Sequence, residues 1–405
     1  MRLTKINQFI KTETKGSILL FTASLLALIL ANSPWTQIYN AIQDTPLVIF
    51  AYQHTIKFSL ADFINNGLMV IFFFTISLEI KRELMEGELS TRAKATLPVI
   101  AAVGGIIFPA IIYLMINFNQ PHLLQGWAIP TATDITFSLG VLALLKTKIP
   151  NAIKVLLTAF AIVDDLGAIL IITFFYSHHL ELLFLALAIL CILVLALFNY
   201  LKIELFWPYA LVGLLLWFFI LQSGVHTTIA GVILGCFIPL TSKHPQQKSL
   251  LHHLEKQLQP WVTFVILPLF ALVNMDVPFS DFKPAEIFTS LPLGIIFGLL
   301  LGKQLGIFSA CWLAIKSGLA ELPTQVHWKH LYGMAIIGGI GFTMSLYIAT
   351  MAFPPDNLHH LPLARVGILI GSVLSGILGY FVLCCINPSA PSRKTAHSKE
   401  KAILK

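Results

Sequence analysis

The chain has 405 residues, of which 57% are hydrophobic and only 11% are charged, whereas about a quarter are charged in soluble globular domains. So small a charged fraction excludes a soluble globular protein and indicates an integral membrane protein. The five cysteines lie in apolar stretches without CxxC spacing, so the sequence predicts neither a disulfide framework nor a zinc site.

Apolar segments long enough to cross a membrane follow one another along the whole chain. A spanning helix needs about 20 mostly apolar residues, and this window places twelve spans at residues 16–30, 60–80, 96–116, 123–145, 151–176, 180–199, 205–221, 224–240, 260–274, 290–315, 331–353 and 363–386. The first segment resembles a cleaved signal peptide in its basic start and short apolar core, but eleven further spans argue against secretion. We predict an all-α polytopic membrane protein with one transmembrane domain, residues 1–386.

The lysines and arginines predict the orientation of the chain, because positively charged loops stay in the cytoplasm. With the amino terminus inside, all but four of the 26 basic residues lie on inner segments. The outer loops hold only Lys57 and Lys283, while Arg365 lies near an outer boundary and Lys303 well inside a span. Both termini are therefore predicted to be cytoplasmic. The net charge of +7 is then a topology signal, and no nucleic-acid partner is implied.

Two segments outside the spans have a character of their own. Residues 47–60, "LVIFAYQHTIKFSL", contain two β-prone runs on either side of Gln53 and His54, which favours a small external β-hairpin over a plain loop. Residues 387–405 are polar and basic, which predicts a cytoplasmic tail.

The fourth and eleventh spans contain helix-breaking or small residues at membrane depth. The fourth contains "AIPTATDI" at residues 128–135, and the eleventh contains "IIGGIGFTMS" at residues 336–345. Interrupted segments in corresponding halves of a chain indicate a transport site built from broken helices. The alternative for the glycines is close helix packing through small residues.

Four charged residues lie deep within predicted spans: Asp134, Asp164, Asp165 and Lys303. Each costs about 2.5–3.5 kcal/mol at the centre of a span, so something must compensate for them. Pairing of one acid with Lys303 as a structural staple leaves two carboxylates unpaired. These can be satisfied by binding a cation or a proton, because burial and a neighbouring negative charge both favour the protonated carboxyl group.

Helix geometry separates the roles of these charges. Adjacent helix residues differ by about 100°, so one of Asp164 and Asp165 can face a cation while the other faces Lys303. Asp134 and Thr133 follow Pro130, where the helix is expected to open and to offer the oxygen ligands that a hard cation prefers. Lys303 can alternatively snorkel to an interface.

Six motifs distributed over nearly the whole chain, "LEIKRELMEG", "AIPTATDI", "AIVDDLGAI", "SGVHTTIAG", "LGKQLGIF" and "GGIGFTMS", resemble the bacterial NhaA family of sodium/proton antiporters. The resemblance implies inverted-topology repeats in spans three to five and ten to twelve, with the two broken spans crossing near the midplane. It also implies a cation and proton site of Asp134, Asp164, Asp165 and Thr133. In that site Asp164 either shares the cation or pairs with Lys303, and Lys303 compensates charge.

The resemblance also assigns a pH response to charges at the cytoplasmic rim. These map onto Glu79, Arg82, Glu83 and Glu255, with His252 and His253 beside the last, and onto His226 in "SGVHTTIAG". A histidine titrates near neutral pH. The alternatives are a solvated charged rim and a hydrogen-bonded core histidine.

These observations lead to one functional hypothesis and two rivals. We expect an electrogenic antiporter, with no cofactor, that exports Na⁺ and also Li⁺ from a bacterial cell in exchange for H⁺. It is expected to sit in the inner membrane as a homodimer. An intramembrane aspartyl protease needs two acids facing each other across a cleft, whereas the closest pair here lies on one helix. A passive cation channel lined by the same carboxylates is the more serious rival.

Overall fold

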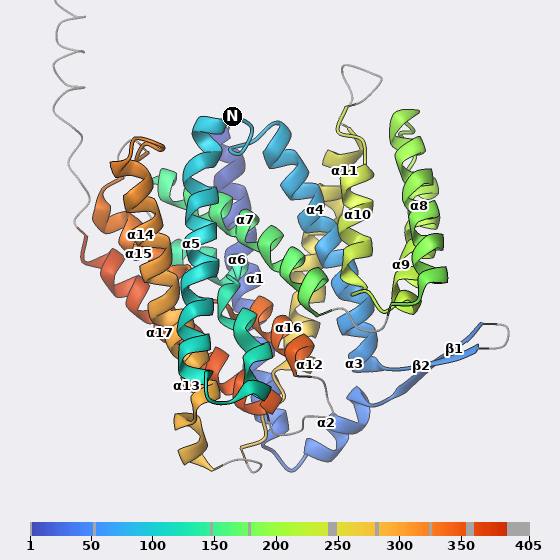
Figure 1. The fold of residues 1–405 in the computed structure, drawn as a ribbon, viewed down its shortest axis with the longest axis horizontal. Helices are drawn as coiled ribbons and strands as arrows, with labels where there is room; N and C mark the ends of the chain where they lie inside the picture. The colour runs from blue at the N-terminus through green and yellow to red at the C-terminus, as the bar shows by residue number, and fades with distance from the viewer. Residues whose placement is uncertain are drawn as a thin grey trace, which may run out of the picture.

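The computed structural model describes residues 2–51, 54–145, 149–176, 180–241, 249–279, 283–323, 326–353 and 360–386. These residues form a bundle of helices with one small sheet (Figure 1). Within them, nine helical segments are long and apolar enough to cross a membrane, and two bent helix pairs raise the number to eleven. The predicted all-α polytopic membrane fold is thereby confirmed. The predicted tail, residues 387–405, lies outside the described residues.

The elements of the first half of the chain are α1 (Arg2–Ala31), α2 (Thr36–Gln43), β1 (Pro46–Ala51), β2 (His54–Ser59), α3 (Leu60–Phe63), η1 (Ile64–Leu68), α4 (Met69–Met85), α5 (Arg92–Asn117), η2 (Pro121–Thr131), α6 (Ile135–Leu144), α7 (Asn151–Phe175) and α8 (Leu182–Tyr200). Those of the second half are α9 (Phe206–Ser223), α10 (Thr228–Phe237), α11 (Leu250–Trp261), η4 (Val262–Ile266), α12 (Leu267–Asn274), η5 (Pro284–Phe288), α13 (Ser290–Phe297), η6 (Gly298–Gly302), α14 (Lys303–Lys316), α15 (Trp328–Ile337), α16 (Phe342–Ala352) and α17 (His360–Cys384). The segments η1, η4 and η6 are π-helical turns inside longer helices.

The eighth predicted span is a shorter helix than its apolar window indicated. Its helix, α10, has 10 residues and is therefore only about 15 Å long, half the thickness of the hydrocarbon core. Gly224, in the left-handed conformation with φ of 80°, ends the preceding helix α9. Ile238, which precedes Pro239, is extended and ends α10, as expected for a residue before proline.

The ninth predicted span begins earlier than the apolar window indicated. Its helix starts at Leu250 and continues through α11, η4 and α12. Ser249 caps the amino terminus by accepting a hydrogen bond from the His252 backbone. The first turns are amphipathic, with Leu251 and Leu254 buried and polar residues between them, so hydropathy alone did not reveal them.

The two β-prone runs form the predicted hairpin. Strands β1 and β2 pair in antiparallel register from Pro46 opposite Ser59 to Ala51 opposite His54. Ser59 then begins α3 in a capping box with Asp62, which fixes where the sheet ends and the helix starts. The hairpin projects from the side of the bundle (Figure 1). Which side of the membrane it occupies stays a prediction.

Both predicted helix breaks are present, and they occupy equivalent places in two similar units. The axis bends by 47° between η2 and α6 and by 44° between α15 and α16. One unit consists of α5, the η2–α6 pair and α7, and the other of α13–α14, the α15–α16 pair and α17. This pattern agrees with an inverted repeat, which stays a prediction.

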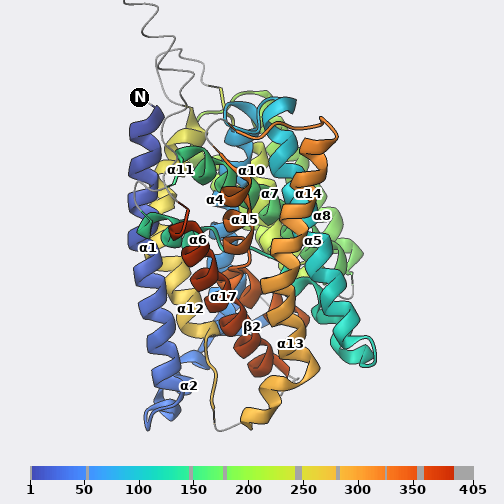
Figure 2. The ribbon, with the colours of Figure 1, turned by 90° about the vertical axis from the view of Figure 1, so that its left-hand side faces the viewer.

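Close helix packing fixes the scaffold around the breaks. Gly104 of α5 and Gly306 of α14 face each other so closely that a Cβ on either would overlap the backbone of the other. Helix α1 runs along α6 and α12 (Figure 2), with Leu20 and Ala27 fully buried, which favours a retained span over a signal peptide. Helices α8, α9 and α10 gather with α4 at one side of the molecule, around a second hydrophobic core (Figure 1).

Candidate functional site

Asp134 lies where the two broken spans cross, at the amino termini of two helices. As the N-cap of α6, its Oδ1 atom accepts a hydrogen bond of 2.9 Å from the Phe137 backbone N–H. Its Oδ2 atom accepts hydrogen bonds from the backbone N–H of Thr343, at 3.0 Å, and from the Thr343 hydroxyl, at 2.5 Å, in the first turn of α16. The partial positive charge of both helix ends therefore stabilises one carboxylate.

Backbone groups freed by each break find partners in the other break. The Thr133 hydroxyl donates a 2.8 Å hydrogen bond to the Gly338 carbonyl, and the Asp134 backbone N–H donates one of 2.6 Å to the Ile340 carbonyl. The Ser345 hydroxyl donates to the Ile129 carbonyl at 2.7 Å. Non-helical backbone is tolerated at membrane depth only when its polar groups are satisfied within the protein, so each break requires the other.

Lys303 pairs with Asp164 in the interior. The Lys303 Nζ atom lies 2.8 Å from Asp164 Oδ2, and neither side chain is exposed. Nζ also donates a 2.9 Å hydrogen bond to the Thr133 hydroxyl and lies 5.5 Å from the centre of the Phe160 ring. Thr133 in turn donates to Gly338 at the carboxyl end of α15. The Thr133 hydroxyl therefore links the charged Lys303 to the negative end of that helix by two hydrogen bonds. A snorkelling Lys303 is excluded.

Two carboxylate oxygens at this place, one on Asp164 itself and one on its neighbour Asp165, have no hydrogen-bond partner. Both Asp164 Oδ1 and Asp165 Oδ1 are buried and unpartnered, and Asp165 as a whole is only 2% exposed. The charged groups that influence Asp165 are Asp164, Asp134 and Glu79, against the single cation Lys303. A buried carboxylate without a donor is strongly unfavourable, so these oxygens are poised to take a proton or a cation.

The three aspartates have different surroundings, although they lie in one region. Asp134 is engaged by donors on both oxygens, Asp164 by Lys303 on one, and Asp165 Oδ1 by none. Among the described residues, no group of three or more His, Cys, Asp or Glu side chains is arranged to hold a metal ion. The available acceptors are thus those of the Asp164–Asp165 pair.

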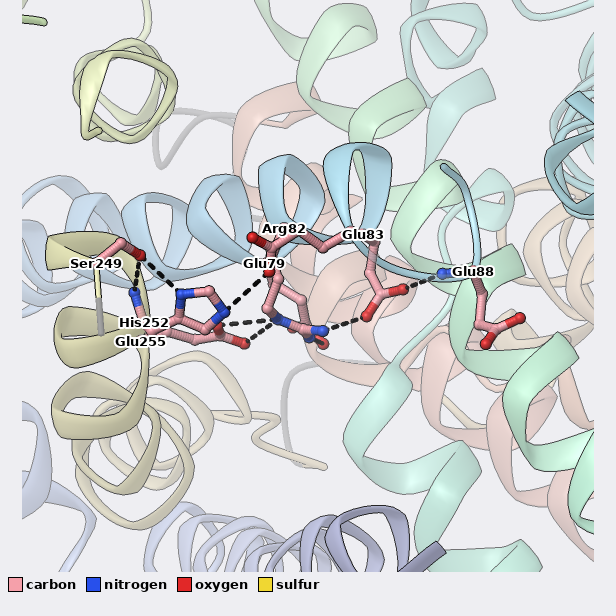
Figure 3. A network of polar contacts seen from close by, with 8 residues as sticks. Glu79, Arg82, Glu83, Glu88, Ser249, His252 and Glu255 are labelled. Carbon is pink, nitrogen blue, oxygen red and sulfur yellow. Dashed lines mark hydrogen bonds and ion pairs between the residues drawn. The ribbon is translucent and has the colours of Figure 1, made fainter. Parts of the chain in front are cut away.

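The predicted rim residues form one network between α4 and α11, at the end of the molecule where the amino terminus lies (Figures 1 and 3). Arg82 is its centre: Nε lies 2.9 and 3.0 Å from the two carboxylate oxygens of Glu255, one Nη lies 2.5 Å from Glu83, and the other lies 3.7 Å from Glu79. His252, also on α11, lies 3.1 Å from Glu86. The Arg82 guanidinium therefore contacts three carboxylates, of which Glu79 and Glu83 lie on its own helix α4 and Glu255 joins α4 to α11.

His226 lies apart from that network. Its Nδ1 atom is 3.1 Å from the Tyr347 hydroxyl and 3.3 Å from the Thr228 hydroxyl, and its Nε2 atom contacts the Met351 sulfur. Tyr347 and Met351 belong to α16. The histidine thus joins the start of α10 to the second half of a broken span, and it shares no hydrogen bond with Arg82.

Sequence reasoning missed two side chains at the crossing. Thr343 holds Asp134 through its hydroxyl and its backbone N–H, and Phe160 lies beneath Lys303. Thr343 could have been noticed, because it follows Gly341 in the second break as Thr133 and Asp134 follow Pro130 in the first. Phe160 lies four residues before Asp164, on the same face of α7, but its contact with Lys303 depends on packing between distant helices.

Residues 7–383 match the model of a protein family described as Na⁺/H⁺ antiporter 1. The chain is also 47% identical over 393 residues to the Na⁺/H⁺ antiporter NhaA of Rhodospirillum rubrum, covering 95% of this chain and 98% of the relative. The chain belongs to the NhaA family. This family consists of transporters and not of enzymes. The function class predicted from the sequence motifs is therefore confirmed.

Other NhaA relatives give the same result over the full chain. The Na⁺/H⁺ antiporter NhaA of Shewanella loihica is 46% identical, with 95% of this chain and 97% of the relative covered. That of Pseudomonas fluorescens is also 46% identical, with 96% of each covered. The similarity to the NhaA relatives therefore extends over nearly the whole length of this chain and of each relative.

Removing one partner of the buried ion pair should destabilise the protein. Lys303→Met leaves Asp164 without its cation, and we expect a loss of about 3–5 kcal/mol in the free energy of unfolding. The loss is measured as a lower unfolding temperature in detergent. In the double variant Asp164→Asn/Lys303→Met no uncompensated pair member remains, so most of the stability should return. Equal destabilisation in single and double variants would contradict the assignment.

Proposed function

We propose that this protein is a sodium/proton antiporter of a bacterial inner membrane that exports Na⁺, and also Li⁺, while protons enter. Membership of the NhaA family supports the exchange of sodium for protons. The observation that carries the proposal to particular residues is the pair of buried, unpartnered oxygens on Asp164 and Asp165. An acceptor that no internal donor satisfies is suited to exchange one positively charged ligand for another.

In the proposed cycle, Na⁺ and protons compete for Asp165 and Asp164. The hard cation takes carboxylate oxygens and the hydroxyl of Thr133, which already lies 2.9 Å from Lys303. Asp134 contributes negative charge from the crossing, where two helix ends hold its carboxylate in place. Only the loaded site, carrying either Na⁺ or protons, reorients across the membrane, because an empty pair of carboxylates leaves its charge uncompensated.

The cycle is proposed to move net charge. If one proton leaves each member of the Asp164–Asp165 pair as one Na⁺ binds, each turnover carries one charge across the membrane. Its driving force is about 2.3 kcal/mol per 100 mV of membrane potential. Lys303 balances the charge of Asp164 when the pair is deprotonated, through the 2.8 Å contact.

Topology and assembly complete the proposal. A single transmembrane domain, residues 1–386, has both termini in the cytoplasm, as the distribution of lysine and arginine indicates. The chain works as a homodimer, and the hairpin β1–β2 is the element that projects far enough from the bundle to reach a second copy (Figure 1). No cofactor takes part, and the partners are Na⁺, H⁺ and the lipid bilayer.

Replacing Asp165 by asparagine should abolish exchange. Everted membrane vesicles containing the native protein should release accumulated protons when Na⁺ is added, read with a pH-gradient dye. Asp165→Asn vesicles should respond like vesicles without the protein, because the amide has no negative charge to hold Na⁺ and does not take up a proton. Asp62→Asn is the matched control, since Asp62 is an exposed residue in the first turn of α3, where it forms the capping box with Ser59, and should remain active. Sodium flux without proton release in the native protein would favour the channel.

Transport should respond to a membrane potential. In proteoliposomes with an imposed potential, Na⁺ movement driven by a pH gradient should speed up or slow down with the sign of the potential. Collapsing the potential with a potassium ionophore should accelerate exchange, because charge no longer accumulates. An exchange rate that neither treatment changes would show electroneutral exchange and would contradict the proposed exchange of two protons for one Na⁺.

The Arg82 network is proposed to set the pH response of the antiporter. Glu255→Gln removes the carboxylate by which α11 binds Arg82, because the other two, Glu79 and Glu83, lie on α4 with the arginine. The variant therefore lacks the ion pair that joins α4 to α11, and its pH of half-maximal exchange should differ from that of the native protein, measured in the same vesicle assay. Glu321→Gln, an exposed position in the loop after α14, serves as the control. Identical pH profiles in the two variants would overturn a role for this network.

A further inference from the structure

The helix that carries Lys303 contains a π turn immediately before that residue. The tenth span is α-helical over α13 and α14, but Gly298–Gly302 between them form the π turn η6, and Lys303 is the first residue that follows. A π turn closes hydrogen bonds to the fifth residue and so holds one residue more than an α turn. Such turns are rare in proteins as a whole, but those that occur are often found at functional sites.

This π turn is in contact with both broken spans. A Cβ on Gly298 would lie 2.6 Å from the Cβ atom of Pro130, next to the first break. A Cβ on Gly339, in the second break, would overlap the carbonyl oxygen of Leu299. Leu299 itself is fully buried. The one irregular segment of the tenth span therefore touches the irregular segments of the fourth and the eleventh.

The helix on either side of the turn is held in place. After the turn, Gly306 of α14 packs backbone to backbone on Gly104 of α5. Before the turn, α13 packs on α17, where a Cβ on Gly367 would lie 3.0 Å from the Pro292 Cα atom. Neither flank can rotate without losing these contacts, and Gly302 at the end of the turn also packs on α5, where a Cβ would lie 2.6 Å from the Pro109 Cα atom. Lys303 can therefore be reoriented only by a shift that passes through the turn and leaves both flanks in place.

We propose that the π turn Gly298–Gly302 moves along the helix during transport and thereby turns Lys303 away from Asp164. The inference rests on the proposed antiport function and adds the positioning element for its lysine. When a π turn migrates past a residue, that residue alone shifts by one helical position, about 100° and 1.5 Å. Its flanks keep their places, as the packing of Gly306 and Gly367 requires.

Such a shift connects the ion site with both breaks. Lys303 would leave Asp164 and the Thr133 hydroxyl in one movement, since the same Nζ atom holds both. Asp164 is then free to take Na⁺ or a proton. The Leu299 carbonyl, which faces Gly339, would move at the same time, so a change at the ion site reaches the second broken span directly. Gly298 and Gly302 are in this sense positioning residues.

Deletion of Leu301 tests the proposal. Removing one residue from the π turn restores a continuous α-helix and leaves α13 and α14 in their present mutual orientation, with Lys303 still facing Asp164. We expect Na⁺ to bind to the purified variant with near-native affinity, measured by calorimetry, while exchange in proteoliposomes falls by about tenfold or more, because a conformational step is lost. Leu305→Ala, an exposed position (51%) on the same helix, should leave both properties unchanged.

Each other result overturns the proposal. Exchange at the native rate would show that the π turn is not needed, and loss of Na⁺ binding would show that it only fixes Lys303 in place. If the deletion variant does not fold, hydrogen exchange of the native protein decides: amide exchange in residues 298–303 should change when Na⁺ is added, and unchanged exchange contradicts the inference. Failure of the antiport hypothesis is recognised separately, because the native protein would then show no sodium-driven proton flux.

Discussion

The contact on which the rest of the site depends is the buried ion pair of Lys303 and Asp164, 2.8 Å apart with neither side chain exposed. A charge in the interior of a membrane protein is unfavourable unless another group compensates for it. Lys303 compensates Asp164 and, through the Thr133 hydroxyl, the carboxyl end of α15. Asp165 receives no such compensation on its Oδ1 atom. In the proposed function, that asymmetry between neighbouring residues of α7 is what suits the site to bind a mobile cation.

The two helix breaks make the asymmetry possible, because they bring helix ends to the place where the charges lie. Asp134 occupies the amino termini of α6 and α16 at once, so its negative charge is stabilised without using the lysine. An unbroken helix would offer no free backbone N–H at that depth. The rim network of Arg82 uses the same principle of charge compensation nearer to water, where the energies are smaller (Figure 3).

Much of the architecture could be predicted from the sequence, since hydropathy, the breaks near Pro130 and Gly338, and the excess of acids over bases deep within the spans are local or countable properties. The short α10 was not predicted, because its apolar flanks satisfy a window while Gly224 and Pro239 end the helix. The choice of Asp164 over Asp165 as the partner of Lys303 was left open, because it depends on the rotation of α14 relative to α7. Nor could periodicity reveal Thr343 as a donor to Asp134, which lies 209 positions away.

The central claim is that Na⁺ and protons compete for the same buried carboxylates. It is tested most directly by adding sodium chloride to the purified protein in weakly buffered detergent solution and recording the pH, with choline chloride as the control salt. The account predicts that Na⁺ binding releases protons from the native protein and that choline releases none. Binding of Na⁺, detected by calorimetry on the same sample, without any release of protons would contradict it.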